Sequence, residues 1–363
     1  MTYYQGLRYN SPVDLKIKFM KQKYVIGIDI SKSKVDCAVI DFGYELKLEK
    51  EVFNKEKTLD AFLKTIAKQL QISQEELLVC CENTGIYNRP LEVVCTRLGI
   101  TLWVEHALKI KRASTDMRGK DDKKDALRIA HYAVRYYDKM VPYQEPSEIV
   151  KQLNILTKAR DTMLSQKVAL ENQLREAKTH DTFEYELLAR AFKKSISILS
   201  KSIKEIEKQI GLLIQKDEQI NQNKQLITSI PGIGNQGAIN LIIATNNFQS
   251  FKSAKHLACY AGVVPFKNQS GTIVKKERVS KMANKTIKKL LHLSAMAAIR
   301  SDKELKGYYL RKVAEGKNKM SVLNAVRNKL VQRIMSVITR KQAYLSQEDY
   351  FYQKRNNFAC LLT

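Results

Sequence analysis

The chain has 363 residues, of which 63 are Lys or Arg and 37 are Asp or Glu, so its formal net charge at pH 7 is +26. This excess of positive charge predicts a polyanionic partner, either nucleic acid or an anionic membrane surface. The N-terminal residues lack the apolar run of a signal peptide, and no window reaches the length of a membrane span. Six cysteines without a CxxC pair favour reduced thiols in a cytoplasmic protein.

Three successive strands, at 24–30, 35–41 and 44–53, are the first recognisable elements after an N-terminal arm (1–21). They are followed by a helix in KTLDAFLKTIAKQL, a buried strand in ELLVCCEN, a helix around NRPLEVVCTRLG and a strand in ITLWVE. Three antiparallel strands and then alternating helices and strands form the element order of a ribonuclease-H-like domain. We therefore predict an α/β domain of this class over residues 22–145.

Four carboxylates stand where such a domain presents ligands. Asp29 ends the first strand, Glu82 ends the fourth, and Asp122 and Asp125 are three residues apart at the start of a helix, so they share one helical face. Each alone could cap a helix or occupy a turn, but the combined pattern is rarer. Clustered carboxylates without Cys or His suit Mg²⁺ or Mn²⁺, and two such ions can assist a phosphodiester displacement. The sequence does not decide between Asp121 and Asp122, and we choose Asp122.

Basic residues surround these aspartates and are predicted to bind the phosphates on which the metal acts. They are Arg118, Lys120, Lys123, Lys124 and Arg128.

A long interval without helix breakers follows, because no glycine occurs between Gly119 and Gly211. In its second half, Ile196, Leu199, Ile203, Ile206, Ile210 and Leu213 recur at alternating steps of three and four, which indicates a heptad seam. We predict a helical hairpin or coiled coil over residues 146–222, turning at THDTFEY. It is either packed on a core or used as a dimerisation stalk.

A compact, mainly helical domain is predicted for residues 223–345, followed by a tail (346–363). Its opening, IPGIGNQGAINLIIA, is typical of a helix-hairpin-helix. Gly232 and Gly234 would open a tight turn whose backbone N–H groups can bind a DNA phosphate. The alternative is a turn that only connects two helices.

Three acidic blocks, IGIDISKSKVDCAVID, CCENTG and GKDDKKDALRIA, resemble those of the DEDD transposases of the insertion-sequence one-ten family. The resemblance covers about residues 22–345. It implies a RuvC-like domain, a coiled coil and a second helical domain, with Asp29, Glu82, Asp122 and Asp125 as the metal-binding tetrad. It also implies a recombinase that excises and inserts its own element, guided by a structured noncoding RNA that bridges target and donor DNA.

The segment after AGVVP resembles the family's second conserved region, in which a serine before glycine attacks DNA phosphate covalently. The matching residue here is Ser270. Lys267, Lys275 and Lys276 flank it and would supply a cationic environment for phosphate. This chain departs from the family in having Ser-Gly-Thr at this point and Ser-Lys-Met-Ala-Asn later, so Ser280 stays open as an alternative nucleophile.

The predicted function is therefore a DNA transposase or recombinase that uses Mg²⁺ or Mn²⁺, binds DNA and a guide RNA, and forms a dimer or tetramer near the nucleoid of a bacterium or archaeon. The first alternative is a RuvC-type endonuclease that hydrolyses branched DNA without a covalent intermediate. A second is a phosphotransferase of the actin and sugar-kinase clan, which would need further glycine-rich loops that the sequence lacks. A third is a non-enzymatic nucleic-acid-binding protein with structural carboxylates.

Overall fold

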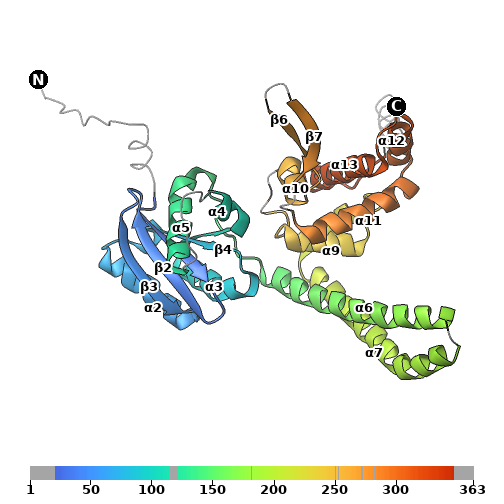
Figure 1. Ribbon diagram of the computed structural model, residues 1–363, viewed down its shortest axis with the longest axis horizontal. Helices are drawn as coiled ribbons and strands as arrows, with labels where there is room; N and C mark the ends of the chain where they lie inside the picture. Colours follow the sequence, from blue (N-terminus) through green and yellow to red (C-terminus); the bar gives the residue numbers. More distant parts are fainter. Residues whose placement is uncertain are drawn as a thin grey trace, which may run out of the picture. The chain divides into compact units, whose positions relative to one another are not determined.

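The computed structural model describes residues 21–113, 122–180, 182–249, 251, 253–270, 273–280 and 283–346. For residues 122, 123, 180, 182, 267–270 and 273–278 the description is limited to the backbone. Two compact units divide the chain between Glu145 and Pro146. Figure 1 shows the elements of both units along the chain, and each unit is described by itself.

A five-stranded sheet with the order β3-β2-β1-β4-β5 forms the centre of the first unit. β1 pairs antiparallel with β2, which pairs antiparallel with β3, whereas β4 and β5 run parallel to β1. This topology confirms the predicted ribonuclease-H-like domain. The strands are β1 (Tyr24–Ile30), β2 (Lys34–Asp41), β3 (Leu46–Phe53), β4 (Leu77–Glu82) and β5 (Thr101–Glu105).

Helices cover both faces of this sheet (Figure 1). α2 (Glu56–Gln69) and α3 (Arg89–Leu98) place Leu59, Leu63 and Leu91 in one buried cluster with alternate residues of the strands. On the other face, Ile110 of α4 (Ala107–Ala113) and Ile129 of α5 (Asp122–Arg135) belong to a second buried cluster. The period-2 alternation of the strands thus separates two cores, one on each side. The described residues of the unit also form the short 3₁₀ helices η1 (Gln74–Glu76), η2 (Gly85–Asn88) and η3 (Tyr137–Lys139).

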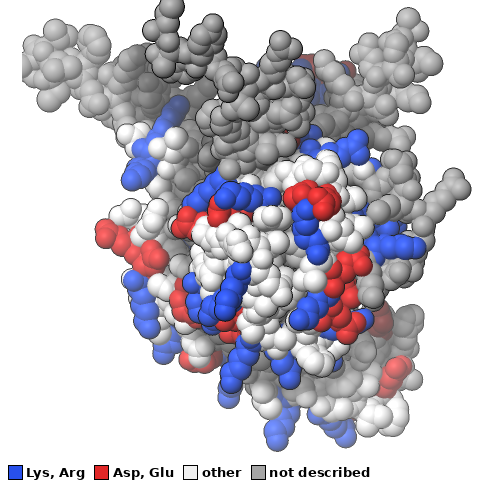
Figure 2. All heavy atoms as spheres, turned by 90° about the vertical axis from the view of Figure 1, so that its left-hand side faces the viewer, with Lys and Arg blue, Asp and Glu red and all other residues white. Residues whose placement is uncertain are grey.

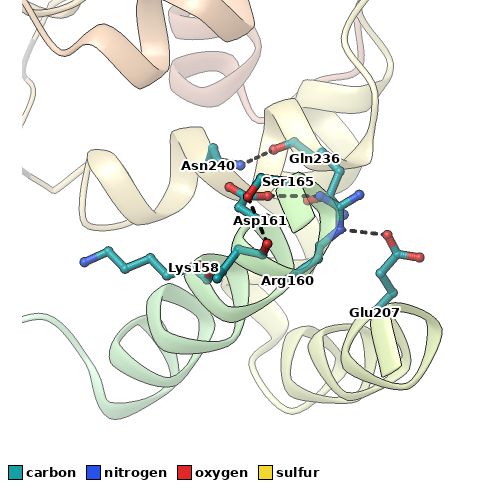
Figure 3. A network of polar contacts seen from close by, with 8 residues as sticks. Lys158, Arg160, Asp161, Ser165, Glu207, Gln236 and Asn240 are labelled. Atoms are coloured by element: carbon teal, nitrogen blue, oxygen red, sulfur yellow. Dashed lines mark hydrogen bonds and ion pairs between the residues drawn. The ribbon is translucent and has the colours of Figure 1, made fainter. Parts of the chain in front are cut away.

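A hairpin of two long helices opens the second unit. α6 spans Glu148–His180 and α7 spans Thr182–Gln215, so the turn between them is much shorter than the predicted THDTFEY. Figure 3 shows an ion pair that joins the helices, in which Arg160 Nε lies 2.7 Å from Glu207 Oε1. Near the hairpin's open end, Leu153 and Ile210 are buried in the core of the unit. Near its turn, Phe183 is 75% exposed.

The remainder of the second unit is mainly helical, as predicted, but it also contains a two-stranded antiparallel hairpin. The helices pack around a single large buried cluster. The elements are α8 (Glu218–Thr228), α9 (Asn235–Ala244), α10 (Ala254–Tyr260), β6 (Pro265–Ser270), β7 (Ile273–Val279), α11 (Lys285–Ser301), α12 (Lys303–Ala314) and α13 (Lys319–Arg340).

The described cysteines carry free thiols, and Cys37, Cys80, Cys81 and Cys95 are buried. Burial raises the pKa of the Cys81 thiol to about 12, so it is protonated at neutral pH. No helix in the described part of the chain is both long and apolar enough to cross a lipid bilayer.

Candidate active site

Asp29 and Glu82 lie beside each other at the carboxyl edge of the sheet. β1 and β4 are parallel, and their last registered pair is Ile28 with Cys81, so the two carboxylates are the next residues on adjacent strands. Both are half-buried. The rigid strands therefore place two of the four predicted residues at one rim, as the sequence predicted.

α5 brings Asp125 to the same face. A Cβ atom added to Gly27 would lie 2.2 Å from the carbonyl oxygen of Ala126, so the helix backbone rests directly on β1 at this glycine. Side chains alternate along a strand, so Asp29 faces the same side as Gly27. Asp125 directly precedes Ala126, and Asp122 begins the helix one turn earlier, although the direction of the Asp122 side chain is outside the description.

Electrostatics link Glu82 with Asp125. Burial raises the pKa of Glu82 above its ordinary value, and the negative charge of Asp125 raises it further, whereas Arg128 and Lys111 lower it. Arg128 Nη1 lies 2.7 Å from Asp125 Oδ1. Arg128, which was predicted to bind phosphate, is thus paired with one of the carboxylates. Two acids near each other in a half-buried setting favour a cation between them.

The donor set fits a hard divalent ion. Asp125 Oδ1 is fully buried, and it accepts no hydrogen bond of good geometry although Arg128 is close. A bound cation would stabilise a buried oxygen of this kind, and Mg²⁺ and Mn²⁺ prefer carboxylate oxygens as ligands. Among the described side chains, no three Asp, Glu, His or Cys residues already form a metal-sized cluster. The assignment of all four residues to metal therefore stays a prediction.

Two further carboxylates on this face were missed in the sequence. Asp36 is registered directly opposite Asp29 on β2 and is only 6% exposed. Glu105 is registered with Glu82 on β5, and its Oε2 accepts a hydrogen bond from the Tyr132 hydroxyl at 3.1 Å. The signal for Asp36 was an acidic residue at an inward position of the strand VDCAVID. Asp36, Asp29, Glu82 and Glu105 thus form a row across four neighbouring strands.

The basic residues predicted around the aspartates are only partly placed. Arg118 and Lys120, together with Asp121, lie outside the described residues. The backbone of Lys123 lies in the first turn of α5, and Lys124 is exposed one residue later. Figure 2 shows Lys and Arg intermixed with Asp and Glu on one face of the molecule.

The predicted helix-hairpin-helix consists of α8, a turn and α9. Gly232 has φ +91°, and a Cβ there would lie 2.6 Å from the Ser294 carbonyl oxygen of α11. Close packing on α11 therefore explains this glycine. Gly234 is the N-cap of α9, and the space around its missing Cβ is open. Of the two glycines predicted to bind phosphate, Gly234 has the more accessible position.

Ser270 is the last residue of β6, registered with Ile273 at the tip of the β6–β7 hairpin. The predicted serine loop is thus a β-hairpin, and Lys267, Lys275 and Lys276 belong to its two strands. Ser280 follows β7 at the base, where its carbonyl lies 3.5 Å from a Cβ added to Gly262. The backbone thus places the two candidate serines at opposite ends of the hairpin, and the choice of Ser270 over Ser280 stays a prediction.

Side-chain amides hold the base of this hairpin. Asn324 Nδ2 donates to the carbonyl of Val263 at 2.8 Å, just before β6 begins. Asn284 Nδ2 donates to the Tyr260 hydroxyl at 2.7 Å, and Asn284 also caps α11. These bonds fix both ends of the hairpin to helices of the core.

A ribonuclease-H-like fold with acidic residues on adjacent strand ends defines a class of metal-dependent enzymes that act on nucleic-acid phosphodiesters. Two family models agree with this class: the DEDD transposase model of the IS110 type matches residues 26–178, and the Transposase IS116/IS110/IS902 family model matches residues 224–310. This chain belongs to that family of transposases.

Several proteins are similar over most of the chain. The Pilin gene-inverting protein of Moraxella bovis is 27% identical over 89% of this chain and 98% of its own length. The Transposase for insertion sequence element IS1111A of Coxiella burnetii is 22% identical over 90% of this chain and 92% of its own. A structure of T. thermophilus RuvC in complex with a Holliday junction substrate aligns over its full length with 34% of this chain, at 12% identity and a TM-score of 0.27.

Proposed function

We propose that this transposase cuts and rejoins DNA at a divalent-metal site formed by Asp29, Glu82, Asp122 and Asp125, with Ser270 as the nucleophile. The observation that carries the proposal is the convergence of Glu82 and Asp125 from β4 and α5, where the charge of Asp125 raises the pKa of Glu82. The pilin gene-inverting and transposase relatives, which are similar over nearly their full lengths, support DNA as the substrate.

The carboxylates have the task of holding Mg²⁺ or Mn²⁺ ions, two in the proposed site. Bound there, the ions supply Lewis-acid stabilisation of the attacking and leaving oxygens. The strands fix Asp29 and Glu82, and the Gly27 contact fixes α5, so the ligands are preorganised by the fold. Arg128 pairs with Asp125 and balances part of the negative charge of the carboxylates.

Ser270 conserves the energy of the cut bond. Its hydroxyl oxygen bonds to phosphorus, the ester bond to one deoxyribose breaks, and that sugar departs as a hydroxyl after taking a proton. A hydroxyl from a new DNA partner then attacks the phosphoserine ester, and the serine regains its proton. No external energy source is needed, because each step exchanges one phosphate ester for another.

The partners that the resemblance implies complete the proposal. A structured guide RNA selects the DNA by base pairing, while the protein binds phosphates with its excess of Lys and Arg. The enzyme acts as a homo-oligomer, a dimer or tetramer, at the nucleoid in the cytoplasm.

Cleavage of the DNA that flanks the gene tests the metal site. Asp29→Asn and Asp125→Asn are nearly isosteric, so each variant is expected to fold and to bind DNA but to lose cleavage by roughly two orders of magnitude or more. Leu46→Ala is the matched control: Leu46 begins β3, at the edge of the sheet away from Asp29 and Glu82, and this variant should keep full activity. Activity that survives thorough chelation, or full activity in Asp29→Asn, would contradict the proposed site.

A further inference from the structure

Three large apolar side chains are exposed at the carboxyl edge of the sheet in the first unit. Phe53 ends β3 and is 67% exposed, while Ile86 and Tyr87 of η2 are 77% and 40% exposed. We call these three residues the apolar rim cluster. β3 runs parallel to β1 and β4, so Phe53 lies at the same edge as Asp29 and Glu82. Exposed side chains of this size gathered beside a site indicate contact with a ligand.

Buried amides hold the cluster in place. Asn54 Nδ2 donates both to the Ser31 carbonyl at 2.9 Å and to the Tyr87 carbonyl at 3.0 Å. It thereby ties the residue after Phe53 to the loop after β1 and to η2. Asn88 is 1% exposed, and its Oδ1 accepts a hydrogen bond from the Thr84 backbone N–H at 2.8 Å. The fold therefore presents Ile86 and Tyr87 on a rigid support, which reduces the entropy lost on binding.

Exposed cations flank the cluster and outnumber the one acid among them, Glu56, which lies between Lys55 and Lys57. Lys32, Lys55, Lys57 and Arg89 are all exposed on the same loops and helix starts. Aromatic and aliphatic side chains between cations are typical of surfaces that bind nucleic-acid bases, where the cations bind phosphates and the apolar groups stack on or between bases. A protein or lipid partner would not need the neighbouring carboxylates, whereas a scissile phosphate does.

We propose that the apolar rim cluster stacks against unpaired DNA bases next to the phosphate that is cut. The identity of the substrate rests on the proposed function. Stacking would hold the strand open beside Asp29 and Glu82 and fix the position of its phosphate. Tyr87 supplies the aromatic face, and Ile86, the most exposed of the three, is placed to enter between neighbouring bases.

A tryptophan reporter tests the stacking. The chain contains one tryptophan, Trp103, which is 2% exposed, so a bound ligand cannot quench its fluorescence by direct contact. Tyr87→Trp and, as control, Leu46→Trp in the full-length protein are titrated with oligothymidylate and with an abasic oligonucleotide of the same length. We expect oligothymidylate to quench Tyr87→Trp strongly, and the abasic strand, which has phosphates but no bases, to leave it unquenched.

Affinity provides the second measurement. Tyr87→Ala and Ile86→Ala should each weaken oligothymidylate binding roughly five- to thirtyfold, with Tyr87→Phe close to wild type and the affinity for the abasic strand unchanged. Equal losses for both strands, or equal quenching of Leu46→Trp, would overturn the proposal.

The outcomes separate this inference from the proposed function. Binding without quenching overturns the stacking and leaves the metal-dependent recombinase intact. Quenching by oligouridylate alone assigns the cluster to RNA and also overturns the proposal. Cleavage that survives chelation contradicts the proposed metal site and leaves the quenching result unaffected.

Discussion

Arg327 is a buried guanidinium, 7% exposed, that has no carboxylate partner among the described residues. Its Nη2 lies 2.6 Å from His292 Nδ1, and its Nη1 lies 3.4 Å from Asn324 Oδ1. Because arginine only donates, His292 Nδ1 must accept, so the imidazole is neutral. Asn324 in turn donates a hydrogen bond to the Val263 carbonyl, just before the β6–β7 hairpin begins. A single neutral histidine thus helps to support the hairpin that carries Ser270.

Protonation of His292 should weaken the second unit. Burial, and then the charge of Arg327, lower the pKa of His292 below its ordinary value. The unfolded chain therefore binds a proton near pH 6.5 that the folded chain takes up only at lower pH, so stability is lost as pH falls below about 6.5. Urea unfolding at about pH 7.5 and about pH 5.5 measures this loss.

His292→Gln is the matched variant, since its amide oxygen can still accept from Arg327 but does not titrate. It should show a smaller loss of stability over the same pH range. An equal loss in wild type and His292→Gln would assign the pH dependence to other groups.

Among the elements, the placement of α5 on β1 is the contact that builds the site. Gly27→Ala would force a Cβ to within 2.2 Å of Ala126 O, so the helix must shift. We expect a loss of about 1–3 kcal/mol in unfolding free energy and a large loss of cleavage, because Asp125 moves with the helix. Gly211→Ala, in α7 with open space around its Cβ, should instead stabilise by up to about 1 kcal/mol. Wild-type stability and cleavage in Gly27→Ala would contradict the close contact.

Apolar runs bounded by turn residues in the sequence predicted most strands and helices of the first unit. The strand Tyr24–Ile30 was predicted with its observed bounds, because an apolar run ends at polar turn residues on both sides. The β6–β7 hairpin was not predicted, since segments such as FKNQS and IVKKERV contain lysines, amides and glutamate of low strand propensity. Strand formation there depends on pairing and on anchoring at Val263, which a local pattern does not contain.

The site was predictable in part. Strand ends identified Asp29 and Glu82, and helical spacing paired Asp122 with Asp125. The approach of Glu82 to Asp125 depends on how α5 lies on the sheet, which is a tertiary contact. Gly27 inside an apolar strand was an available signal, because glycine there marks the close approach of another backbone.

The whole molecule carries a formal charge of +26 and only 8% aromatic residues, so phosphate contacts should dominate its binding to RNA. We expect the purified protein to carry structured RNA and to lose it steeply as salt rises, with a log–log slope that reports several phosphate contacts. Filter binding over a salt series measures that slope. Protein that cleaves its DNA site after complete removal of RNA would contradict guidance by RNA.

The proposed chemistry uses Ser270 as the nucleophile and the four carboxylates as metal ligands. Trapping a covalent protein–DNA adduct on labelled element DNA tests this claim most directly, with wild type, Ser270→Ala and Ser280→Ala compared. We expect an adduct with wild type and Ser280→Ala and none with Ser270→Ala. An adduct that persists in Ser270→Ala, or no adduct in any variant despite metal-dependent cutting, would contradict it, and the latter would indicate a nuclease that uses water.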